Sequence, residues 1–398
     1  MQALGERREK SVPYKVNSKL NRMQCIGCRA LYPLDDYFEG CPVCLEAGAP
    51  TSVVPHYTEW PPSLEFETIG DWLSYPDASG LGEGNTSLSK LPRLAAALGI
   101  SALSTKNEFA NPTGSHKDRM VAKIVQRAVC VGAKTIAVAS SGNAGVSMAA
   151  YAARNGLDCV VVTTPDISPN WRRAIEMHGA RIIATATPDD RWALIAHHAQ
   201  AGDWYPATNY IIPPVGSNPF GVDAYRAIAL ELYLQLQQEP PTDIVVPTAR
   251  GDLLWGISKG YQDLRDAGFA QSIPRVHAVE PYPRIHRALS GQGLIGAFPD
   301  DTIMGSIGGI TVSQQSLQAL NMTNASSVAV DDDTVSADQL VVAREGLYLE
   351  LSSVATLSGL RKLINEQKVA ENAHVVLVAT SHGYKEYPRF ANPRVSID

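Results

Sequence analysis

Short apolar runs alternate with amphipathic stretches between residues 135 and 185. The runs "TIAVA" (135–139), "CVVVTT" (159–164) and "ARIIAT" (180–185) are apolar and bounded by polar turns, which predicts buried strands. Between them, "VSMAAYAARNG" and "NWRRAIEMHG" have helical spacing. The first helix is expected to start near Val146 and to end at Gly156, a residue type typical of helix C-caps. This order of elements predicts a mostly parallel sheet with helices on both faces.

The same pattern recurs in the carboxyl-terminal half. Residues 243–246 ("DIVV"), 275–280 ("RVHAVE") and 374–379 ("HVVLVA") predict further buried strands, and "LLWGISKGYQDLRDAG" predicts a helix after the first of them. The Gly- and Ser-rich stretch 285–331 is expected to hold loops and short strands. The fold class expected is therefore α/β, with two doubly wound domains facing each other.

Composition narrows the class of function. The 398 residues are 45% hydrophobic, enough for a large core, and 34 Lys and Arg against 40 Asp and Glu give a formal net charge of -6. This balance argues against a general binder of nucleic acid or acidic membranes and favours small-molecule chemistry. The polar first twenty residues contain no signal-peptide run, and no segment approaches the ~18 apolar residues of a membrane span, so a cytoplasmic protein is expected.

Four of the six cysteines form two C-x-x-C pairs, Cys25 with Cys28 and Cys41 with Cys44. Each short gap lets a tight turn aim both thiolates at one ion, so the spacing predicts a structural zinc ribbon. Four reduced surface cysteines or a labile disulfide pair are the alternatives. Cys130 and Cys159 lie in apolar runs and are expected in the core. The expected division of the chain is a ribbon at 20–50, a smaller α/β domain at 95–215 and a larger α/β domain formed by 51–94 and 216–398.

Candidate chemistry centres on "NPTGSHKDR", residues 111–119. An apolar helical pattern follows, and Ser115 with Asp118 has the spacing of a capping box, so a helix is predicted to begin beside Lys117. The positive end of a helix dipole disfavours an ammonium ion there and favours the free amine that a Schiff base requires. The alternative is an exposed lysine on the first turn of a helix.

Several longer segments occur in a fixed order: "LGEGNTSLSKLP", "KNEFANPTGSHKDR", "SSGNAGVSMAAYAARNGL", "VPTARGDLLWGISKGY", "REGLYLELSSVATLSGL" and "VATSHGYKEY". Together they resemble the threonine synthase branch of the fold-type II pyridoxal-phosphate enzymes over roughly residues 80–387. An amino-terminal zinc ribbon is also similar to that of some threonine synthase and cysteate synthase relatives. The resemblance implies a fold like that of the tryptophan synthase beta subunit, with the cofactor in the cleft between the two α/β domains.

The resemblance also implies roles for individual residues. Lys117 would hold the cofactor as a Schiff base and later move protons. Asn143 would hydrogen-bond the ring oxygen of the cofactor, and the hydroxyl of Thr380 would face its pyridine nitrogen, which suits elimination or replacement chemistry. The turn made by Ser140, Ser141 and Gly142 would bind the substrate carboxylate at a helix amino terminus. Plain capping of that helix is the alternative for this turn.

The chain departs from the family pattern in the loop that holds the cofactor phosphate. The family has a glycine-rich loop there, whereas this chain has Ala249, Arg250, Gly251, Asp252 and Leu253. A carboxylate beside a phosphate is unfavourable unless it points away, and Arg250 could offset its charge.

Two further departures concern residues around the cofactor and the substrate. His116 stands where most threonine synthases have Phe, and it resembles the histidine that lies near the cofactor phosphate in the tryptophan synthase beta subunit. A solvated or capping histidine is the alternative. In the family's substrate segment Asn218 remains, but Gly221 and Arg226 stand at the usual Arg and Lys.

The function implied is a lyase that removes phosphate, or a similar γ-substituent, from an O-phosphohomoserine-like amino acid and adds water at the β-carbon. One alternative is β-replacement or β-elimination on O-phosphoserine or a similar serine derivative. Another is an inactive relative that binds cofactor or ligand, or a zinc-dependent interaction protein. The expected cofactors are pyridoxal 5'-phosphate and structural Zn²⁺. The expected partner is a small, phosphorylated amino acid rather than nucleic acid or membrane, and the resemblance alone implies a homodimer.

Overall fold

The computed structural model describes residues 14–78, 80–298 and 302–386. Most of the amino-terminal stretch on which the prediction of no signal peptide rests lies outside these residues, as do residues 387–398, which were assigned to the larger domain. Among the described residues, no helix combines the length and the apolar character that crossing a bilayer requires.

One sheet of the described chain has four parallel strands in the order β8-β7-β6-β9. Its strands are β6 (Thr135–Ala139), β7 (Asp158–Thr163), β8 (Arg181–Ala184) and β9 (Tyr205–Pro206). The neighbouring helices are α3 (Lys117–Cys130), α4 (Asn143–Asn155), α5 (Pro169–Met177) and α6 (Pro188–Gln200). The first three strands confirm the predicted runs to within one residue at each end. The helix α4 starts at Asn143 rather than near Val146, because the Ser-Gly turn before it leads directly into the first turn.

A second sheet of the described chain has six strands in the order β12-β11-β10-β13-β5-β4, and only the edge strand β4 is antiparallel to its neighbour. Its strands are β4 (Leu88–Lys90), β5 (Ala102–Lys106), β10 (Asp243–Pro247), β11 (Arg275–Glu280), β12 (Ser327–Ala329) and β13 (His374–Val378). The strand β5 pairs with β13 here, although the predicted boundary at residue 95 assigns β5 to the smaller domain.

Helices cover both faces of the six-stranded sheet. They are α2 (Pro92–Leu98), α7 (Pro219–Ala224), α8 (Arg226–Gln235), α9 (Asp252–Asp266), α10 (Arg284–Leu289), α11 (Gln314–Thr323), α12 (Asp332–Arg344) and α13 (Leu351–Asn365). Short 3₁₀ turns are η1 (Phe66–Trp72), η2 (Glu108–Ala110), η3 (Gly305–Ile307) and η4 (Gly383–Lys385). Because both faces are covered, Ile244 and Val246 enter one hydrophobic cluster while the intervening Val245 enters another.

The prediction for residues 285–331 was wrong in part. Besides loop and the strand β12, this stretch contains most of α10 and all of α11. The helix α11 has the polar sequence "QQSLQALNMT" and buries Ala319 and Leu320 against the core, so its apolar stripe is too narrow to stand out in the sequence.

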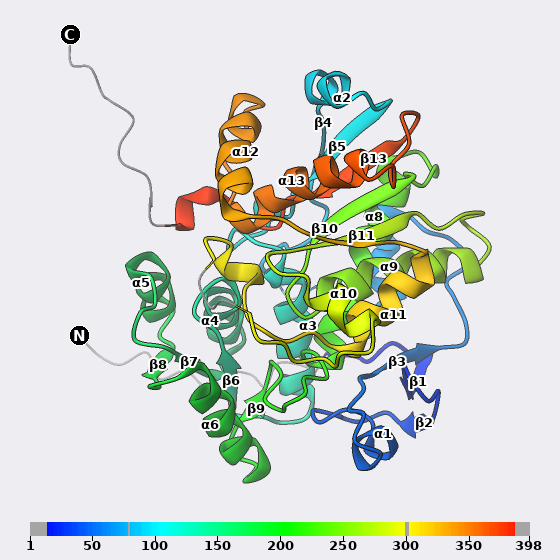
Figure 1. Cartoon of the computed structure of the whole chain (residues 1–398). Coiled ribbons are helices and arrows are strands. Elements are labelled where there is room, and N and C mark those ends of the chain that lie inside the picture. The colour runs from blue at the N-terminus through cyan, green and yellow to red at the C-terminus, as the bar shows by residue number, and fades with distance from the viewer. Residues whose placement is uncertain (1–13, 79, 299–301, 387–398) are drawn as a thin grey trace, which may run out of the picture.

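The amino-terminal unit has a three-stranded antiparallel sheet in the order β2-β1-β3. Its elements are β1 (Leu20–Cys25), β2 (Leu31–Pro33), α1 (Pro42–Glu46) and β3 (Val53–Tyr57). The strand β3 lies just beyond the predicted ribbon boundary at residue 50. In Figure 1 this unit lies at the lower right, beside the four-stranded sheet at the lower left and below the six-stranded sheet.

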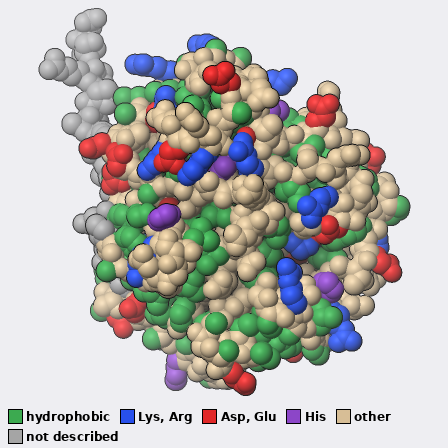
Figure 2. All heavy atoms as spheres, turned by 45° about the vertical axis from the view of Figure 1, so that its right-hand side comes forward, with side chains coloured by type: hydrophobic (Ala, Val, Ile, Leu, Met, Phe, Trp, Pro, Cys, Tyr) green, Lys and Arg blue, Asp and Glu red, His purple; other side chains and the backbone are tan. Residues whose placement is uncertain are grey.

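A continuous hydrophobic cluster joins the two α/β sheets. It contains Ile136 and Val161 from the four-stranded sheet and Ile244 and Val376 from the six-stranded sheet. The helix α3 packs against α4 and α7, and Figure 1 shows it at the centre of the molecule. On the face drawn in Figure 2, basic and acidic side chains are mixed among neutral ones, in keeping with the small net charge of -6.

Candidate active site

Lys117 is the first residue of α3 and is half-buried. Its Nζ lies 3.5 Å from the hydroxyl of Tyr225. Burial lowers the pKa of Lys117 to about 8, against the opposing charges of Asp252 and Glu350. Because the amine sits on the first turn of a long helix, the helix dipole also disfavours its charged form. The exposed-lysine alternative does not describe this side chain.

The turn before Lys117 differs from the predicted capping box. The N-cap residue of α3 is His116, and the hydroxyl of Ser115 has no hydrogen-bond partner among the described residues. The carboxylate of Asp118 instead accepts hydrogen bonds from the backbone N–H of Thr113 (2.6 Å) and from the hydroxyl of Ser147 on α4 (2.6 Å). Asp118 therefore ties the turn to α4 rather than capping its own helix.

His116 is buried and bonded, so the solvated alternative is wrong. Its backbone N–H donates to the carbonyl oxygen of Thr380 (2.9 Å), and its Nδ1 lies 3.3 Å from the same oxygen. Burial, together with the charge of Lys117, holds the pKa of His116 well below its usual range. The ring is therefore neutral, and a proton on Nδ1 can be donated to Thr380.

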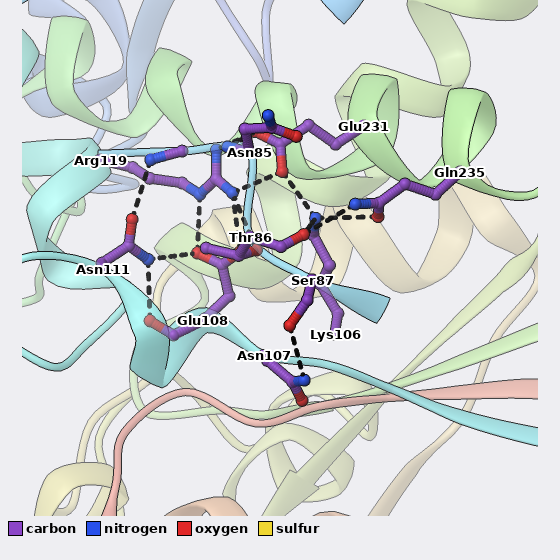
Figure 3. A network of polar contacts seen from close by, with 11 residues as sticks. Asn85, Thr86, Ser87, Lys106, Asn107, Glu108, Asn111, Arg119, Glu231 and Gln235 are labelled. Carbon is purple, nitrogen blue, oxygen red and sulfur yellow. Dashed lines mark hydrogen bonds and ion pairs between the residues drawn. The ribbon is translucent and has the colours of Figure 1, made fainter. Parts of the chain in front are cut away.

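A buried network of charged side chains holds α3 two residues after Lys117 (Figure 3). Arg119 makes ion pairs of 2.6 Å with Glu108 and with Glu231 on α8. Lys106 on β5 makes a third pair of 2.6 Å with Glu231, and its Nζ also donates to the carbonyl oxygen of Thr86. Buried charges require such complete pairing, and here it joins α3, β5, α8 and the segment around Thr86.

Asn143 starts α4 and meets residues from distant segments. Its Nδ2 donates to Glu350 (2.7 Å) and to Ser306 (3.3 Å), while its Oδ1 accepts from Lys385 (2.8 Å) and Ser381 (3.4 Å). Sequence reasoning gave no role to Glu350, Lys385 or Ser306. The sequence offered one signal for each of two of them. Glu350 is a charged residue inside the largely apolar motif "LYLELSSVATLSGL", and Lys385 is a charged residue close to Thr380.

The turn before α4 has two kinds of contact. The hydroxyl of Ser140 accepts from the backbone N–H groups of Gly142 (3.2 Å) and Gly145 (3.1 Å), which is helix capping as the alternative reading expected. The hydroxyl of Ser141 instead accepts from Arg191 on α6 (3.1 Å). A Cβ at Gly142 would lie 3.3 Å from the indole of Trp171, so this position is tightly packed.

The predicted phosphate loop connects β10 to α9, as the sequence indicated. Gly251 has a φ of 103°, and an added Cβ would lie 2.2 Å from the hydroxyl oxygen of Ser316, so only glycine fits. The carboxylate of Asp252 accepts from the backbone N–H (3.1 Å) and the hydroxyl (2.7 Å) of Ser217. Arg284 donates to the carbonyl oxygen of Thr248 (2.9 Å) and so fixes the start of the loop.

The remaining loop residues point in different ways. Leu253 is buried in the main hydrophobic cluster, and Ala249 packs against the second cluster. The guanidinium of Arg250 lies over the ring of Trp192 on α6, with Cζ 5.5 Å from the ring centroid. Its Nε is buried and has no hydrogen-bond partner among the described residues.

The predicted substrate segment is used for packing at three positions. Asn218 is buried, donates to the hydroxyl of Tyr205 (2.9 Å) and caps α7 through Phe220 N (3.0 Å). At Gly221 a Cβ would lie 2.5 Å from Ile124 on α3, so the family's arginine has no room there. Arg226 is buried and paired with Asp223 and Asp263.

Thr380 follows β13 and is 5% exposed. Its hydroxyl lies 2.7 Å from the hydroxyl of Ser353 on α13. Its neighbour Ser381 donates to the carbonyl oxygen of Gly114 (3.1 Å) and to Asn143. These bonds bring the segments carrying Lys117, Asn143 and Thr380 together.

The four cysteines of the ribbon form one cluster. Their sulfur atoms all lie within 4.8 Å of one another, and the pairs Cys25–Cys44 and Cys28–Cys41 are each 3.7 Å apart. Tetrahedral zinc with bonds of ~2.3 Å separates its sulfur ligands by ~3.8 Å, so the residues fit such an ion. All six cysteines are free thiols, so the disulfide alternative is wrong, and burial of Cys25 and Cys41 excludes four surface thiols.

The two remaining cysteines differ from each other in burial. Cys159 is buried in β7, as predicted. Cys130, at the end of α3, is only half-buried rather than in the core. Its thiol donates to the carbonyl oxygen of Tyr14 (2.9 Å).

Comparison with known proteins identifies the family. The model of the family described as "Pyridoxal-phosphate dependent enzyme" matches residues 80–381. The chain belongs to this family. It is 28% identical over 386 residues to the threonine synthase of Methanocaldococcus jannaschii, covering 91% of this chain and 92% of that protein. The threonine synthase of Methanosarcina acetivorans is also 28% identical, with 92% of each chain covered.

Solved structures share the fold. O-ureido-L-serine synthase superposes with a TM-score of 0.62 at 20% identity, covering 81% of this chain and 93% of that one. The L-serine ammonia-lyase of Rhizomucor miehei superposes with a TM-score of 0.62 at 22% identity, covering 75% and 94%. These superpositions confirm the predicted fold-type II architecture. The family match and the threonine synthase relatives confirm the predicted divergent, threonine-synthase-like pyridoxal-phosphate enzyme of the lyase class.

The residues present fit that cofactor. Lys117 offers a partly accessible amine of lowered pKa, and the first turn of α9 offers backbone N–H groups to a phosphate. Asp252 is turned toward Ser217, which satisfies the condition under which its carboxylate is compatible with a nearby phosphate.

Proposed function

We propose that the chain removes phosphate from the γ-carbon of an O-phosphohomoserine-like amino acid and adds water at the β-carbon. The observation that carries this proposal is the amine of Lys117, held with a pKa of about 8 where the segments of Asn143 and Thr380 meet. The similarity to two archaeal threonine synthases along nine-tenths of the chain supports the choice of reaction.

The chain's own residues supply binding, orientation and proton transfer. Pyridoxal phosphate, when bound, supplies the electron sink that makes loss of the α-proton possible. Lys117 Nζ takes that proton as a free amine and returns it later, because a pKa near 8 leaves both forms accessible at neutral pH. The positive end of α4, with the turn of Ser140, Ser141 and Gly142, binds and orients the α-carboxylate.

Other residues hold the cofactor in register. Asn143 would hydrogen-bond the ring oxygen of the cofactor, and Glu350 and Lys385 fix the orientation of its amide. The hydroxyl of Thr380 would face the pyridine nitrogen, and the loop 249–253 would hold the phosphate group. His116 holds Thr380 in place, because its backbone N–H donates to the carbonyl oxygen of Thr380.

The ribbon belongs to this proposal as a structural zinc site. One Zn²⁺ held by Cys25, Cys28, Cys41 and Cys44 would stabilise the amino-terminal unit without chemistry of its own, because four thiolates leave no open coordination position. A homodimer is part of the same proposal, and light scattering of the purified protein tests it.

The decisive experiment is product analysis with purified protein, supplied with pyridoxal phosphate and O-phosphohomoserine. We expect equal amounts of inorganic phosphate and threonine from the wild type and neither from Lys117→Ala. Absence of both products from the wild type, alongside a cofactor absorbance band that depends on Lys117, would reject the substrate but keep the enzyme class.

A second candidate function is β-replacement or β-elimination on O-phosphoserine. It is favoured by one observation, the lack of space for an arginine at Gly221, which removes the family's expected phosphate contact. Release of phosphate from O-phosphoserine but not from O-phosphohomoserine would select it. If neither substrate reacts and no cofactor binds, the inactive relative remains.

A further inference from the structure

Two arginines from different parts of the fold lie near the candidate site. Arg191 lies in the first turn of α6, and its Nη1 donates to Ser141, a member of the proposed carboxylate turn. Arg250 leaves the loop before α9 and extends to Trp192, the residue after Arg191. Arg250 therefore lies against the turn of α6 that carries Arg191, and Arg191 in turn contacts Ser141.

Arg250 does not serve its own loop with its side chain. The loop is held by Ser313 and Ser316, which donate to the carbonyl oxygen of Arg250 at 2.6 and 2.9 Å, and by Arg284. The nearby carboxylate of Asp252 is occupied by Ser217. The buried Nε of Arg250 is left without a hydrogen-bond partner among the described residues, which is costly for a cation unless an anion is bound.

Burial and mutual repulsion act against the charged forms of both arginines. Burial lowers the pKa of Arg250, with only Asp252 opposing. Burial also lowers the pKa of Arg191, and the charge of Arg250 lowers it further, against the opposing charges of Asp166 and Asp189. Two guanidinium groups that disfavour each other in this way form a site suited to a ligand of high negative charge.

The other anionic groups expected in the site have separate binding elements. The α-carboxylate has the turn before α4, and the cofactor phosphate has the first turn of α9. A further anion on the substrate side chain has no cation at Gly221, which is packed on Ile124, or at Arg226, which is paired with Asp223 and Asp263. Arg191 and Arg250, which lie beside the carboxylate turn and in the phosphate loop, can fill this need.

We infer that Arg191 and Arg250 bind a second anionic group at the far end of the substrate side chain, a phosphate or a carboxylate, and thereby select the substrate class. The inference rests on the proposed function, since it assumes that an amino acid is bound at the turn of Ser141. Arginine binds such groups with two parallel hydrogen bonds, so two arginines can enclose a tetrahedral phosphate from two sides.

The experiment compares three unreactive amino acids of matched chain length bound to the cofactor-loaded protein. They are the phosphonate analogue of O-phosphohomoserine with a methylene in place of the ester oxygen, α-aminoadipate, and norvaline, which has no second anion. Dissociation constants are measured from the change in cofactor absorbance. The proteins are the wild type, Arg191→Gln, Arg250→Gln and Arg250→Lys, with Arg265→Gln as control because its side chain is exposed and pairs with Asp266.

We expect Arg191→Gln and Arg250→Gln each to weaken the phosphonate by about 10-fold or more, since a charged hydrogen bond contributes ~1.5–3 kcal/mol. Norvaline binding should change by less than about 2-fold, because the α-carboxylate contacts remain. Arg250→Lys should retain part of the phosphonate affinity, and Arg265→Gln should match the wild type. Whichever of the phosphonate and α-aminoadipate loses more affinity identifies the natural group.

Other outcomes would overturn the inference. Equal weakening of all three ligands in Arg191→Gln would assign that residue to the α-carboxylate. Loss of cofactor from Arg250→Gln, with unchanged ligand binding in Arg191→Gln, would assign Arg250 to the cofactor phosphate. The proposed reaction is judged separately by turnover: phosphonate binding that depends on both arginines, without turnover of O-phosphohomoserine, would sustain this inference and reject the reaction.

Discussion

Lys117 owes its reactivity to position rather than to residue type. Burial lowers its pKa to about 8, whereas Asp252 and Glu350 act to raise it and Arg250 acts to lower it. An exposed lysine titrates near ~10.4, so at neutral pH the free amine is far more abundant here than on the surface. The same amine can therefore attack the cofactor aldehyde and exchange a proton near physiological pH.

The rate at which cofactor-free protein takes up pyridoxal phosphate covalently should follow this pKa. Because the amine loses its proton as the pH rises through about 8, we expect the rate to rise up to that pH and to level off above it. Stopped-flow absorbance across a pH series measures this rate. Nα-acetyl-lysine is the reference, and its rate should keep rising toward pH ~10.4. A protein profile that parallels the reference would contradict the lowered pKa.

Substitution of Asp252 tests how its negative charge affects cofactor binding. Asp252→Asn keeps the shape that meets Ser217 but removes a negative charge from the first turn of α9. We expect pyridoxal phosphate to bind up to about 30-fold more tightly, because a charge pair ~8 Å apart contributes roughly 2 kcal/mol at an effective dielectric of ~20. The pKa of Lys117 should also fall in this variant, because the charge of Asp252 raises that pKa in the wild type. Weaker cofactor binding in this variant, measured by equilibrium dialysis, would mean that the carboxylate organises the loop.

Some residues of this site can be predicted from the sequence and others cannot, for a physical reason. Lys117, Asn143 and Thr380 stand in local motifs, and the structure joins their segments through hydrogen bonds. Glu350 and Lys385 lie more than two hundred residues from Asn143 along the chain, so their contacts with it exist only after folding.

Among the elements, buried parallel strands were the easiest to predict. With both faces covered, they are continuous apolar runs such as "TIAVA", whose predicted bounds match those of β6. The helix α11 was missed because tertiary packing, rather than a strong apolar stripe, stabilises it. The start of α3 was predicted, but its capping box was not formed because Asp118 binds Thr113 and Ser147 instead.

The ribbon contacts the elements that carry the candidate site. Asp36 pairs with Arg127 near the end of α3 and accepts from Tyr205, whose hydroxyl in turn accepts from Asn218. Ser52 donates to the carbonyl oxygen of Val215, two residues before the Ser217 that binds Asp252. Stability of the ribbon is therefore connected to the segment that precedes α7 and to the phosphate loop.

Loss of zinc should consequently weaken cofactor binding as well as the ribbon. We expect Cys41→Ser to lose most of its metal and to bind pyridoxal phosphate more weakly than the wild type, because the contacts of Ser52 and Asp36 loosen. Cys130→Ser is the matched control, since Cys130 lies outside the cluster. Metal analysis and cofactor titration give the two readouts. Unchanged zinc content in Cys41→Ser would reject the metal site, and unchanged cofactor affinity in a zinc-free variant would reject the connection.

At the scale of the whole molecule, the buried charge network joins α3 to β5 of the six-stranded sheet and to α8. Arg119 on α3 pairs with Glu108, which follows β5, and with Glu231 on α8, which also binds Lys106 (Figure 3). Burial alone would raise the pKa of Glu231, but the charges of Arg119 and Lys106 lower this pKa to about 2. A carboxylate with a lowered pKa stabilises the fold above its unfolded pKa of ~4.3, and this contribution is lost as the pH falls toward 2.

Removal of the central arginine tests whether this network holds the two sheets in place. Arg119→Gln leaves Glu108 and Glu231 without one partner, and breaking a buried ion pair in this way costs ~3–5 kcal/mol. We expect a large fall in the urea midpoint at pH 7, and a smaller difference from the wild type at pH 4, where protonation of the unpaired carboxylates relieves the variant. Arg172→Gln breaks only the exposed pair with Glu176 and should shift the midpoint little. If Arg119→Gln unfolds at the same urea concentration as Arg172→Gln, then apolar packing around α3, rather than the buried charges, holds the sheets together.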